Sequence, residues 1–405
     1  MDRPYPPAGR NVTAQRKRVC FVVANEITAT AFLLDQIREV AAQYEVCVVL
    51  NTRNPSFLGA YGITVEVVSV RIERRIRPLA DLKALFALWR LFRARRFDLV
   101  HSVTPKAGLL AVLAGFLAHV PRRLHVFTGQ VWVTKAGIAR KILKYVDTLL
   151  ATLATDVLVD SPSQRDFLIA QGVVSPHKST VLARGSISGV DIARFRPDNA
   201  ARAAIRQELS VAGDGVIFLF LGRLNRDKGV LDLAAAYARL CRQHSDVWLI
   251  VVGPDEQALS KNIRQICEPC ADRVRLVDYT SEPERFMAAA DVFCLPSYRE
   301  GFGTVVIEAA ACGVPAIASR IYGLTDAVVE GETGLLHAPG DVDALTAAMA
   351  RLSADSGLRR TLGEAARSRA LADFPMPALT SALLDFYAKI LRTHLKNTTP
   401  TSNRR

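Results

Sequence analysis

Short apolar segments rich in β-branched residues alternate with helical patterns along most of this chain. In the first half, strands are expected at residues 19–24, 45–50, 64–68, 99–102, 124–127 and 157–160. Helices are expected between them, among others at residues 32–43, 80–95 and 107–118. Strands that alternate with helices pair in parallel, because each helix returns the chain to the same end of the sheet. The pattern therefore predicts a doubly wound parallel sheet.

The alternation is interrupted once, at residues 179–197, which carry three turn signals. Beyond this break a second set of strands is expected at residues 217–221, 248–252, 275–278, 292–295, 316–318 and 334–337. A chain of 405 residues is also longer than one compact core usually accommodates. We therefore predict an α/β protein with two Rossmann-like parallel-sheet domains that face a central cleft. Their expected limits, with those of the flanking segments, are 1–17 (disordered), 18–190 (N-terminal domain), 191–376 (C-terminal domain), 377–395 (a helix that packs back on the N-terminal domain) and 396–405 (disordered).

The positive charge of the chain is concentrated in its first half. Residues 1–190 contain 26 Lys and Arg against 13 Asp and Glu, whereas residues 191–405 contain 26 of each kind. The whole net charge of +13 therefore lies in residues 1–190, and most of it in the predicted N-terminal domain. An anionic partner is expected there, which could be lipid headgroups, a phosphorylated acceptor or nucleic acid.

Seven cysteines are scattered along the chain, at positions 20, 47, 241, 267, 270, 294 and 312. Their odd number and apolar surroundings predict free, buried thiols in a reducing compartment. Cys267 and Cys270 have the spacing of half a zinc site, but no second Cys or His pair is close in sequence, so we expect structural cysteines.

Residues 1–18 lack the apolar run of a secretory signal. The longest apolar stretch, residues 109–118, is about half as long as a membrane-spanning helix. The protein is therefore expected to be cytoplasmic.

Two strand ends in the second half carry a set of charged residues and glycines. The first strand of this half is followed by Arg223 and Lys228 in the sequence GRLNRDKG. A later strand is followed by Glu300 and Glu308 in the sequence EGFGTVVIE. The carboxyl ends of parallel strands form the ligand-binding edge of a sheet, so these side chains are expected to share one cleft. Carboxylates accept hydrogen bonds from hydroxyl groups, which suits Glu308 to a ribose diol and Glu300 to a sugar.

The same segment suits the diphosphate of a nucleotide-sugar. Arg223 and Lys228 can supply positive charge, together with the first amides of a helix that starts at Thr304. Gly301 and Gly303 would let the backbone approach a phosphate without a Cβ atom in the way. The alternative is a structural glycine turn that carries solvated charges.

With these motifs the chain resembles the retaining glycosyltransferases of the GT-B fold that are related to glycogen and sucrose-phosphate synthases. Many bacterial members of that group build lipid-linked polysaccharides. The resemblance is most specific over residues 216–340, in FLGRLNRDKG, DVFCLPSYREGFGTVVIEAAACGVPAIAS and GETGLL, and covers the first half more loosely. It implies a GT-B fold with the nucleotide-sugar donor bound in the second domain and the acceptor in the first. In the donor site, Arg223 and Lys228 would bind the diphosphate and Glu308 the ribose. Glu300 and the backbone amides of Gly301, Phe302 and Gly303 would hold the transferred sugar, and the backbone near Gly253, Tyr279 and Thr280 would face the base. Gly222 and Thr304 are further residues expected to bind the donor.

The resemblance also implies a mechanism. The acceptor hydroxyl attacks the sugar on the face that the diphosphate leaves, and a phosphate oxygen takes its proton. Arg223, Lys228 and Glu300 are expected to be the catalytic residues, mainly through stabilisation of charge, and no cofactor or metal ion is expected. Asp341 and Asp343 form a DxD sequence, which we interpret as a helix cap.

The first domain departs from the family pattern in two turns. Its first strand is followed by ANEITAT in place of glycines, which also argues against a dinucleotide site. Many relatives have a His before a Gly after the fifth strand, and Thr128 takes that place here, in the sequence FTGQVW. Thr128, Gly129 and Gln130 are expected to line the acceptor side of the cleft. His125 is either a core residue or a catalytic one, and Lys106 either binds an acceptor phosphate or lies solvated at a helix start.

Residues 71–96 form a basic segment with nine Lys or Arg and two acidic residues. Its apolar residues recur at helical spacing: Leu82, Leu85, Phe86, Trp89 and Phe92. Such a helix can lie on an anionic membrane, although a helix that covers a sheet also needs an apolar stripe. The density of cations favours peripheral membrane contact. No nucleic-acid partner is expected, because the cations are not interleaved with stacking aromatics on a recognisable module.

The sequence therefore predicts a metal-independent retaining glycosyltransferase at the inner face of the cytoplasmic membrane. It would move a hexose or an N-acetylhexosamine from a UDP-sugar to a polyprenyl-diphosphate-linked or other cell-surface polysaccharide acceptor, as in capsule or lipopolysaccharide synthesis. The alternatives are a GT-B transferase or phosphorylase that acts on a soluble sugar, and a non-catalytic partner that binds a nucleotide-sugar.

Overall fold

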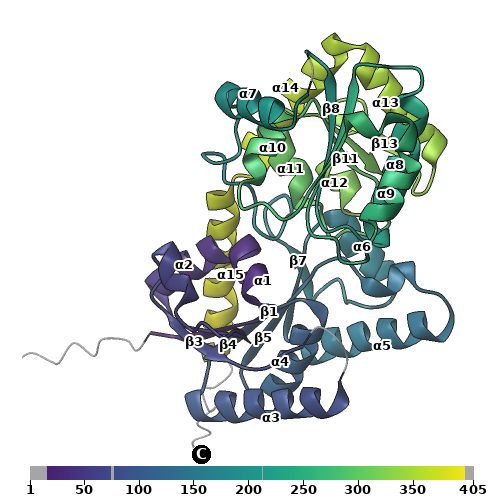
Figure 1. Cartoon of the computed structure of the whole chain (residues 1–405). Helices are drawn as coiled ribbons and strands as arrows, with labels where there is room; N and C mark the ends of the chain where they lie inside the picture. Colours follow the sequence, from purple (N-terminus) through teal and green to yellow (C-terminus); the bar gives the residue numbers. More distant parts are fainter. Residues whose placement is uncertain (1–15, 74–76, 212, 397–405) are drawn as a thin grey trace, which may run out of the picture.

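Two parallel sheets, each in its own domain, form the core of the computed structural model, which describes residues 16–73, 77–211 and 213–396. The N-terminal sheet has seven strands in the order β3-β2-β1-β4-β5-β6-β7. The C-terminal sheet has six strands in the order β10-β9-β8-β11-β12-β13. Figure 1 shows the C-terminal domain above the N-terminal one. The predicted α/β fold with two doubly wound sheets is confirmed.

Helices cover both faces of the N-terminal sheet, because successive side chains of its strands point to opposite sides. Val19, Phe21 and Val23 of the first strand pack in one apolar cluster, and Cys20 and Val22 pack in another. The strands are β1 (Arg18–Asn25), β2 (Glu45–Asn51), β3 (Glu66–Ser69), β4 (Leu99–Val103), β5 (Arg122–Phe127), β6 (Asp156–Val159) and β7 (Ser179–Val181). The helices are α1 (Glu26–Phe32), α2 (Leu34–Gln43), α3 (Pro78–Arg95), α4 (Pro105–Leu117), α5 (Gly137–Leu153) and α6 (Pro162–Ala170), with short 3-10 helices η1 (Phe57–Tyr61) and η2 (Val131–Thr134).

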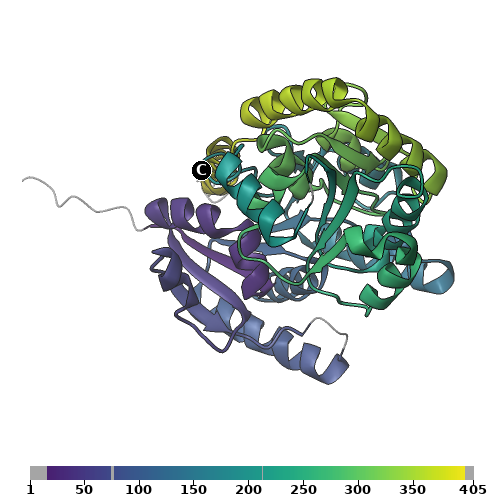
Figure 2. The same ribbon diagram turned by 45° about the horizontal axis from the view of Figure 1, so that its top comes forward.

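The C-terminal sheet is built in the same way around one large apolar cluster. Its strands are β8 (Val216–Leu221), β9 (Val247–Val252), β10 (Val274–Val277), β11 (Val292–Leu295), β12 (Ala316–Ser319) and β13 (Gly334–His337). Its helices are α7 (Asn199–Glu208), α8 (Val230–Leu240), α9 (Ser260–Ile266), α10 (Pro283–Ala289), α11 (Thr304–Ala311), α12 (Leu324–Ala327), α13 (Val342–Ala354) and α14 (Ser356–Asp373), with 3-10 helices η3 (Arg226–Lys228) and η4 (Glu268–Arg273). Figure 2 shows α13 and α14, in yellow-green, along the outer edge of this domain.

The chain crosses between the domains twice, and the two crossings lie side by side. Val190 donates a backbone hydrogen bond to Phe374 at 2.8 Å, and Met376 donates one to Val190 at 2.9 Å. The last helix, α15 (Met376–Lys396), then runs from the upper domain along the lower one (Figure 1). Leu383 and Tyr387 of this helix belong to the same apolar cluster as β1 and α2, so the C-terminal end of the chain completes the N-terminal core.

The structure differs from the sequence-based expectations at two segments of the first domain. Residues 179–181 were assigned to the break between domains, but they form β7, which pairs with β6 at the edge of the sheet. The ANEITAT sequence was expected to be a turn and forms α1 instead. Asn25 explains this helix, because its Oδ1 accepts a hydrogen bond from the Thr28 amide at 3.0 Å and caps the N-terminus.

The expectation that all seven cysteines are free thiols is wrong. Cys241 and Cys270 form a disulfide between the end of α8 and η4. The other five cysteines are buried free thiols. Cys270, which has half-zinc-site spacing to Cys267, is thus engaged in the disulfide.

Three further expectations concern helix ends, membrane spans and the termini. The interpretation of Asp341 as a helix cap is confirmed, since its Oδ1 accepts a hydrogen bond from the Ala344 amide at 2.9 Å. In the part of the chain that the structure describes, no helix has both the length and the apolarity to cross a membrane. Disorder was expected for residues 1–17 and 396–405. Apart from residues 16, 17 and 396, these two segments lie outside the described residues.

Candidate functional site

Lys228 and Glu300 meet at the carboxyl ends of two neighbouring strands, β8 and β11. The Nζ atom of Lys228 lies 2.5 Å from Oε1 of Glu300, and the Ser297 hydroxyl donates to the same oxygen at 2.8 Å. The two side chains are only 19% and 13% exposed, so this ion pair is shielded from much of the solvent. The structure thus joins the two motifs that the sequence placed on separate strand ends.

The turn that carries Lys228 is held by its own backbone and by a glycine. Asn225 Oδ1 accepts from the Lys228 amide at 3.2 Å. Gly229 follows with a φ of 67°, and a Cβ atom there would collide with the carbonyl oxygen of Pro296. Only glycine allows this turn to lie directly on the segment after β11, which is why the lysine reaches Glu300.

The glycine loop after Glu300 lies against the other domain. A Cβ atom on Gly301 would collide with Asp160 Oδ2 and lie 3.0 Å from the Gly129 amide nitrogen. In the reverse direction, a Cβ atom on Gly129 would lie 3.1 Å from the Glu300 carbonyl carbon. Gly301 therefore serves the close approach of the two domains, a reason that the sequence did not suggest.

The following residues start the helix that was expected here. Phe302 is buried, with its ring edge-on to Phe374 at 5.2 Å between centroids. Gly303, with a φ of 86°, precedes α11, and the Thr304 hydroxyl lies 3.3 Å from that of Ser186 in the other domain.

Arg223 does not point at the Lys228–Glu300 pair. One of its terminal nitrogens lies 3.0 Å from both carboxylate oxygens of Glu256, and 43% of the Arg223 side chain is exposed. In this structure, therefore, only one of the two cations expected at the diphosphate lies beside Glu300.

The remaining residues expected near the nucleotide lie along the same edge of the sheet. Gly222 and Gly253 follow β8 and β9, and a Cβ atom on Gly253 would collide with the Gly222 carbonyl oxygen. Tyr279, after β10, has 69% of its surface exposed. Thr280 Oγ1 accepts a hydrogen bond from the Glu282 amide at 3.0 Å. These turns form a rim of backbone and one exposed ring beside Arg223.

Glu308 lines a cavity of about 300 Å³ between α11, the segment after β7 and helices α1 and α2. Burial raises the pKa of Glu308 to about 7, an effect that the nearby Arg194 opposes. Arg194 lines the same cavity and is fixed by Glu284, whose Oε2 accepts from its Nε at 2.8 Å. A carboxyl group in a cavity next to an arginine suits a ligand with both hydroxyl groups and negative charge.

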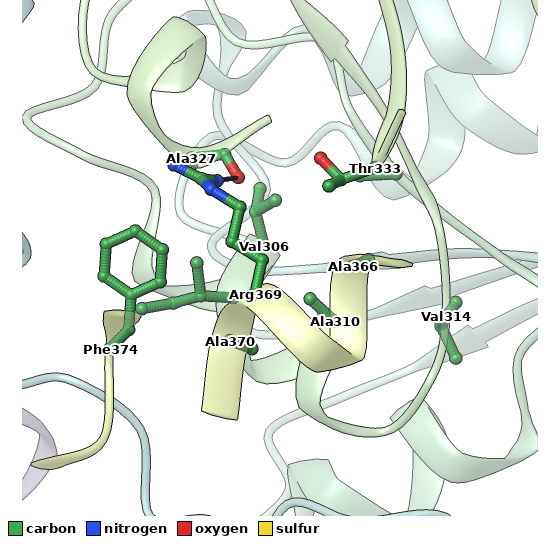
Figure 3. A pocket seen from close by; sticks show the side chains of 11 residues that line it. Val306, Ala310, Val314, Ala327, Thr333, Ala366, Arg369, Ala370 and Phe374 are labelled. Atoms are coloured by element: carbon green, nitrogen blue, oxygen red, sulfur yellow. Dashed lines mark hydrogen bonds between the residues drawn. The ribbon is translucent and has the colours of Figure 1, made fainter. Parts of the chain in front are cut away.

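A second cavity, shown in Figure 3, lies behind α11 and has a volume of only about 10 Å³. Arg369 crosses it and donates hydrogen bonds to the carbonyl oxygens of Asp326 and Ala327 at 2.6 and 2.8 Å. This cavity has no room for a substrate. Its arginine instead ties α14 to the end of α12, where Asp326 contacts the other domain.

The two domains are joined by hydrogen bonds at the start of α6. Ser161 Oγ donates to the Gly301 carbonyl oxygen at 3.1 Å. The Ser163 amide donates to Asp326 Oδ2 at 2.9 Å, and the Ser163 hydroxyl donates to the same oxygen. Next to these bonds, Tyr322 stacks on Phe167 with 4.5 Å between ring centroids. No pattern in the sequence indicated these contacts, because their partners are about 140 to 160 positions apart.

The loop after β5, which was expected to line the acceptor side of the cleft, is held inside the N-terminal domain. Gln130 is buried and donates to the Thr128 carbonyl oxygen at 2.6 Å, and Gln164 donates to the same oxygen at 2.8 Å. The Gln130 side chain therefore supports the loop and does not itself face the cleft. Gly129 is the residue of this loop that meets Glu300.

Of the two alternatives for His125, the structure favours the core residue. His125 is buried in β5, and its Nδ1 lies 3.0 Å from the hydroxyl oxygen of Ser102. Its ring also fills the space against Gly108. Burial lowers the pKa of His125 to about 3, so the side chain is a neutral core residue.

Lys106 is neither solvated nor directed at the cleft. Its Nζ lies 2.6 Å from Asp81 Oδ1 of α3, and both side chains are about one-fifth exposed. This ion pair ties the start of α4 to α3.

Asp160 is a site residue that the sequence analysis missed. It directly follows β6, is 5% exposed and lies against Gly301. Burial, and then the negative charge of Glu300, raise the pKa of Asp160 to about 8. Its place after a buried strand was visible in the sequence, but its contact with the glycine loop was not. Elsewhere, no group of three or more His, Cys, Asp and Glu side chains among the described residues is placed to hold a metal ion.

Two family models match this chain, one in each domain. The model of the glycosyl transferases group 1 matches residues 201–369, and that of the glycosyl transferase 4-like domain matches residues 28–185. The capsular polysaccharide biosynthesis glycosyltransferase CapM of Staphylococcus aureus is 30% identical over 324 residues, which are 80% of this chain and 85% of that protein. The chain belongs to the group 1 family of glycosyltransferases.

One further sequence relative and two solved structures are similar to this glycosyltransferase. The UDP-Gal:alpha-D-GlcNAc-diphosphoundecaprenol alpha-1,3-galactosyltransferase of Escherichia coli is 26% identical over 320 residues, 78% of this chain and 81% of that protein. The crystal structure of Anabaena HepE in complex with UDP and glucose has a TM-score of 0.78 at 21% identity and covers 93% of this chain and all of that one. Sucrose-phosphate synthase from Thermosynechococcus elongatus has a TM-score of 0.77 at 24% identity and covers 93% and 100%. The predicted GT-B fold is confirmed.

Proposed function

We propose that this glycosyltransferase is a retaining enzyme that transfers a hexose or an N-acetylhexosamine from a UDP-sugar to a lipid-linked or other cell-surface saccharide, without a metal ion. The observation that carries the proposal is the shielded Lys228–Glu300 pair beside the glycine loop, at the edge where the two domains meet. The pair holds a cation and a hydroxyl-binding carboxylate side by side, as a sugar diphosphate requires. Two relatives support the donor and acceptor classes, since HepE binds UDP and glucose and the Escherichia coli galactosyltransferase uses a diphosphoundecaprenol-linked acceptor.

In the proposed reaction, Lys228 stabilises the negative charge that develops on the departing diphosphate. The acceptor oxygen forms a bond to the anomeric carbon while the bond from that carbon to the diphosphate oxygen breaks. The proton of the acceptor hydroxyl passes to the departing phosphate group. Glu300 orients the sugar, and Arg223 would have to leave Glu256 to reach the diphosphate.

We also propose contact with an anionic membrane through the N-terminal domain. Part of the predicted apolar stripe of α3 is exposed, namely Leu82 and Phe86, whereas Phe92 is buried in the core. Helix α5 adds a second exposed stripe, with Ile138 at 76% and Tyr145 at 68% exposure. This stripe is flanked by Lys135, Arg140, Lys141 and Lys144. Both helices pack against α4 on one side of the sheet (Figure 1), so apolar groups and cations share a surface that suits anionic lipid.

Nucleotide binding tests the first proposal. UDP and UDP-sugars should raise the thermal unfolding midpoint of the purified protein, and ADP or GDP should raise it less. Transfer to a lipid-linked saccharide should continue in the presence of EDTA. Absence of any shift with UDP and UDP-sugars would contradict the donor assignment, and loss of activity in EDTA would contradict the metal-free mechanism.

Vesicle sedimentation tests the membrane contact. The protein should bind vesicles that contain phosphatidylglycerol more strongly than vesicles of phosphatidylcholine alone, and Ile142→Glu should weaken this binding. Tyr61→Glu is the matched control, because Tyr61 is an exposed apolar residue on η1, outside these helices. Equal binding by the two variants would contradict a contact through α5.

A further inference from the structure

Asp160 occupies a fixed position between the two domains. Its amide donates to Gln164 Oε1 at 2.7 Å, and its carbonyl oxygen accepts from the Ser186 amide at 2.7 Å. The backbone is therefore held from both sides, and the carboxyl group has little freedom to turn away from Gly301, on which a Cβ atom would collide with Asp160 Oδ2.

The carboxyl group itself lacks the partners that a buried carboxylate needs. Among the described residues, Oδ1 of Asp160 is fully buried and has no hydrogen-bond partner. No ion pair of Asp160 with a described Lys, Arg or His is found either. Two cations of the neighbouring segments have other partners: Lys228 pairs with Glu300, and Arg299 pairs with Asp227 at 2.8 Å. An ionised carboxylate that is buried without a partner is strongly destabilising.

The charged and titratable neighbours of Asp160 explain how the group is tolerated. Glu300, on the loop after β11, is the acidic neighbour and disfavours a second negative charge. On the other side, His101 of β4 lines a small cavity with Asp160, and burial lowers the pKa of this histidine to about 3, so it brings no positive charge. Asp160 therefore keeps its proton at neutral pH and has an O–H group to donate.

A neutral O–H donor beside a carboxylate acceptor is a pair that matches a hydroxyl-bearing ligand. Each sugar hydroxyl can both donate and accept a hydrogen bond. Glu300 can therefore accept from a hydroxyl group of the sugar while Asp160 donates to a hydroxyl group of the sugar. We propose that Asp160, in its neutral acid form, donates a hydrogen bond to a sugar hydroxyl held between the two domains. The inference rests on the proposed glycosyl transfer, and the sugar belongs either to the donor or to the acceptor.

The test compares two variants that remove the acid in different ways. Asp160→Asn keeps the size and a hydrogen-bond donor, whereas Asp160→Leu keeps the branched shape and the number of heavy atoms without any hydrogen bond. UDP alone should bind the wild type and both variants equally in calorimetry, since it does not reach the sugar subsite. At pH 7, Asp160→Asn should retain transfer within about threefold, and Asp160→Leu should lose about tenfold or more.

The kinetic constants show which sugar is contacted. If it is the donor sugar, Asp160→Leu should weaken binding of the UDP-sugar but not of UDP. If it is the acceptor sugar, the variant should raise the KM for the acceptor instead. In either case wild-type transfer should fall as the pH rises through about 8, where Asp160 loses its proton, and the Asp160→Asn profile should lack this fall.

Two results would overturn the inference. One is an Asp160→Leu variant with wild-type constants for both substrates. The other is an alkaline fall that is the same in the wild type and in Asp160→Asn, because a purely structural role would leave the pH profile unchanged. If the wild type itself fails to bind UDP, the proposed function is wrong, and this outcome is distinct because it does not involve Asp160.

Discussion

Replacement of Lys228 by alanine tests the centre of the proposed mechanism. In the structure this lysine is paired with Glu300 at 2.5 Å, and the pair is largely shielded from solvent. The change removes the only cation that is paired with Glu300 among the described residues and leaves that carboxylate without its ionic partner. We therefore expect Lys228→Ala to act more strongly on the chemical step than on binding of the nucleotide.

The expected decrease in kcat follows from a comparison of what the lysine contributes in the ground state and in the transition state. In the free enzyme its charge is already compensated by Glu300, so its net contribution to ground-state binding of the diphosphate is reduced. In the transition state the diphosphate gains negative charge, and loss of one preorganised donor typically costs about 3 to 4 kcal/mol. This corresponds to a decrease in kcat of about 10² to 10³. The unpaired Glu300 would add repulsion in the same direction.

The assay is steady-state transfer from a UDP-sugar, with calorimetry of UDP binding measured in parallel. Arg226→Ala is the matched control, since Arg226 lies in the same short helix, is exposed, and changes the net charge by the same amount. Lys228→Ala should lose at least about a hundredfold in kcat, and Arg226→Ala should stay near the wild type. Equal kcat values for the wild type and Lys228→Ala would refute the role of this ion pair in leaving-group stabilisation.

Two other substitutions test separate parts of the site, and a third tests a buried carboxyl group of the N-terminal domain. Glu308→Gln should weaken UDP binding about tenfold in calorimetry, because a carboxylate oxygen that accepts from a hydroxyl is lost; unchanged affinity would remove Glu308 from the nucleotide site. Gly301→Ala should lower the rate of transfer at least about tenfold, because the added Cβ would collide with Asp160 and force the domains apart. A wild-type rate would contradict the need for the contact between Gly301 and Asp160. Asp147, which accepts from Trp132 Nε1 at 2.8 Å, has a pKa that burial raises to about 6. The native state therefore binds more protons than the unfolded state between about pH 4 and 6. In urea unfolding, the stability of the wild type relative to Asp147→Asn should fall as the pH rises through this range. A constant difference in stability would contradict the shifted pKa.

The strand–helix alternation was sufficient to predict the architecture. Every strand expected from the sequence is present, because buried parallel strands need continuous apolar runs that the sequence shows directly. The edge strand β7 escaped prediction because it has only three residues and lies among turn signals. Helix α1 was not predicted, because a turn was expected there and the helix depends on a single cap residue, Asn25.

The candidate site, too, could be predicted from the sequence only in part. The meeting of Lys228 with Glu300 followed from strand order, since ligands gather at the carboxyl ends of parallel strands. The orientation of Arg223 towards Glu256 did not follow, because a long side chain chooses among partners that only the folded chain brings within reach. The disulfide between Cys241 and Cys270 was missed for a similar reason, as 29 positions separate its two cysteines.

By itself, the sequence determined the two parallel sheets, the edge at which a ligand would bind and the motifs gathered there, because these depend on apolar periodicity and on local turn chemistry. Tertiary structure alone decided that Gly301 faces Asp160, that Ser163 holds Asp326, and that His125 is a core residue. These contacts join residues from different domains or neighbouring strands, and their energies depend on distance and burial, which no local pattern in the chain encodes.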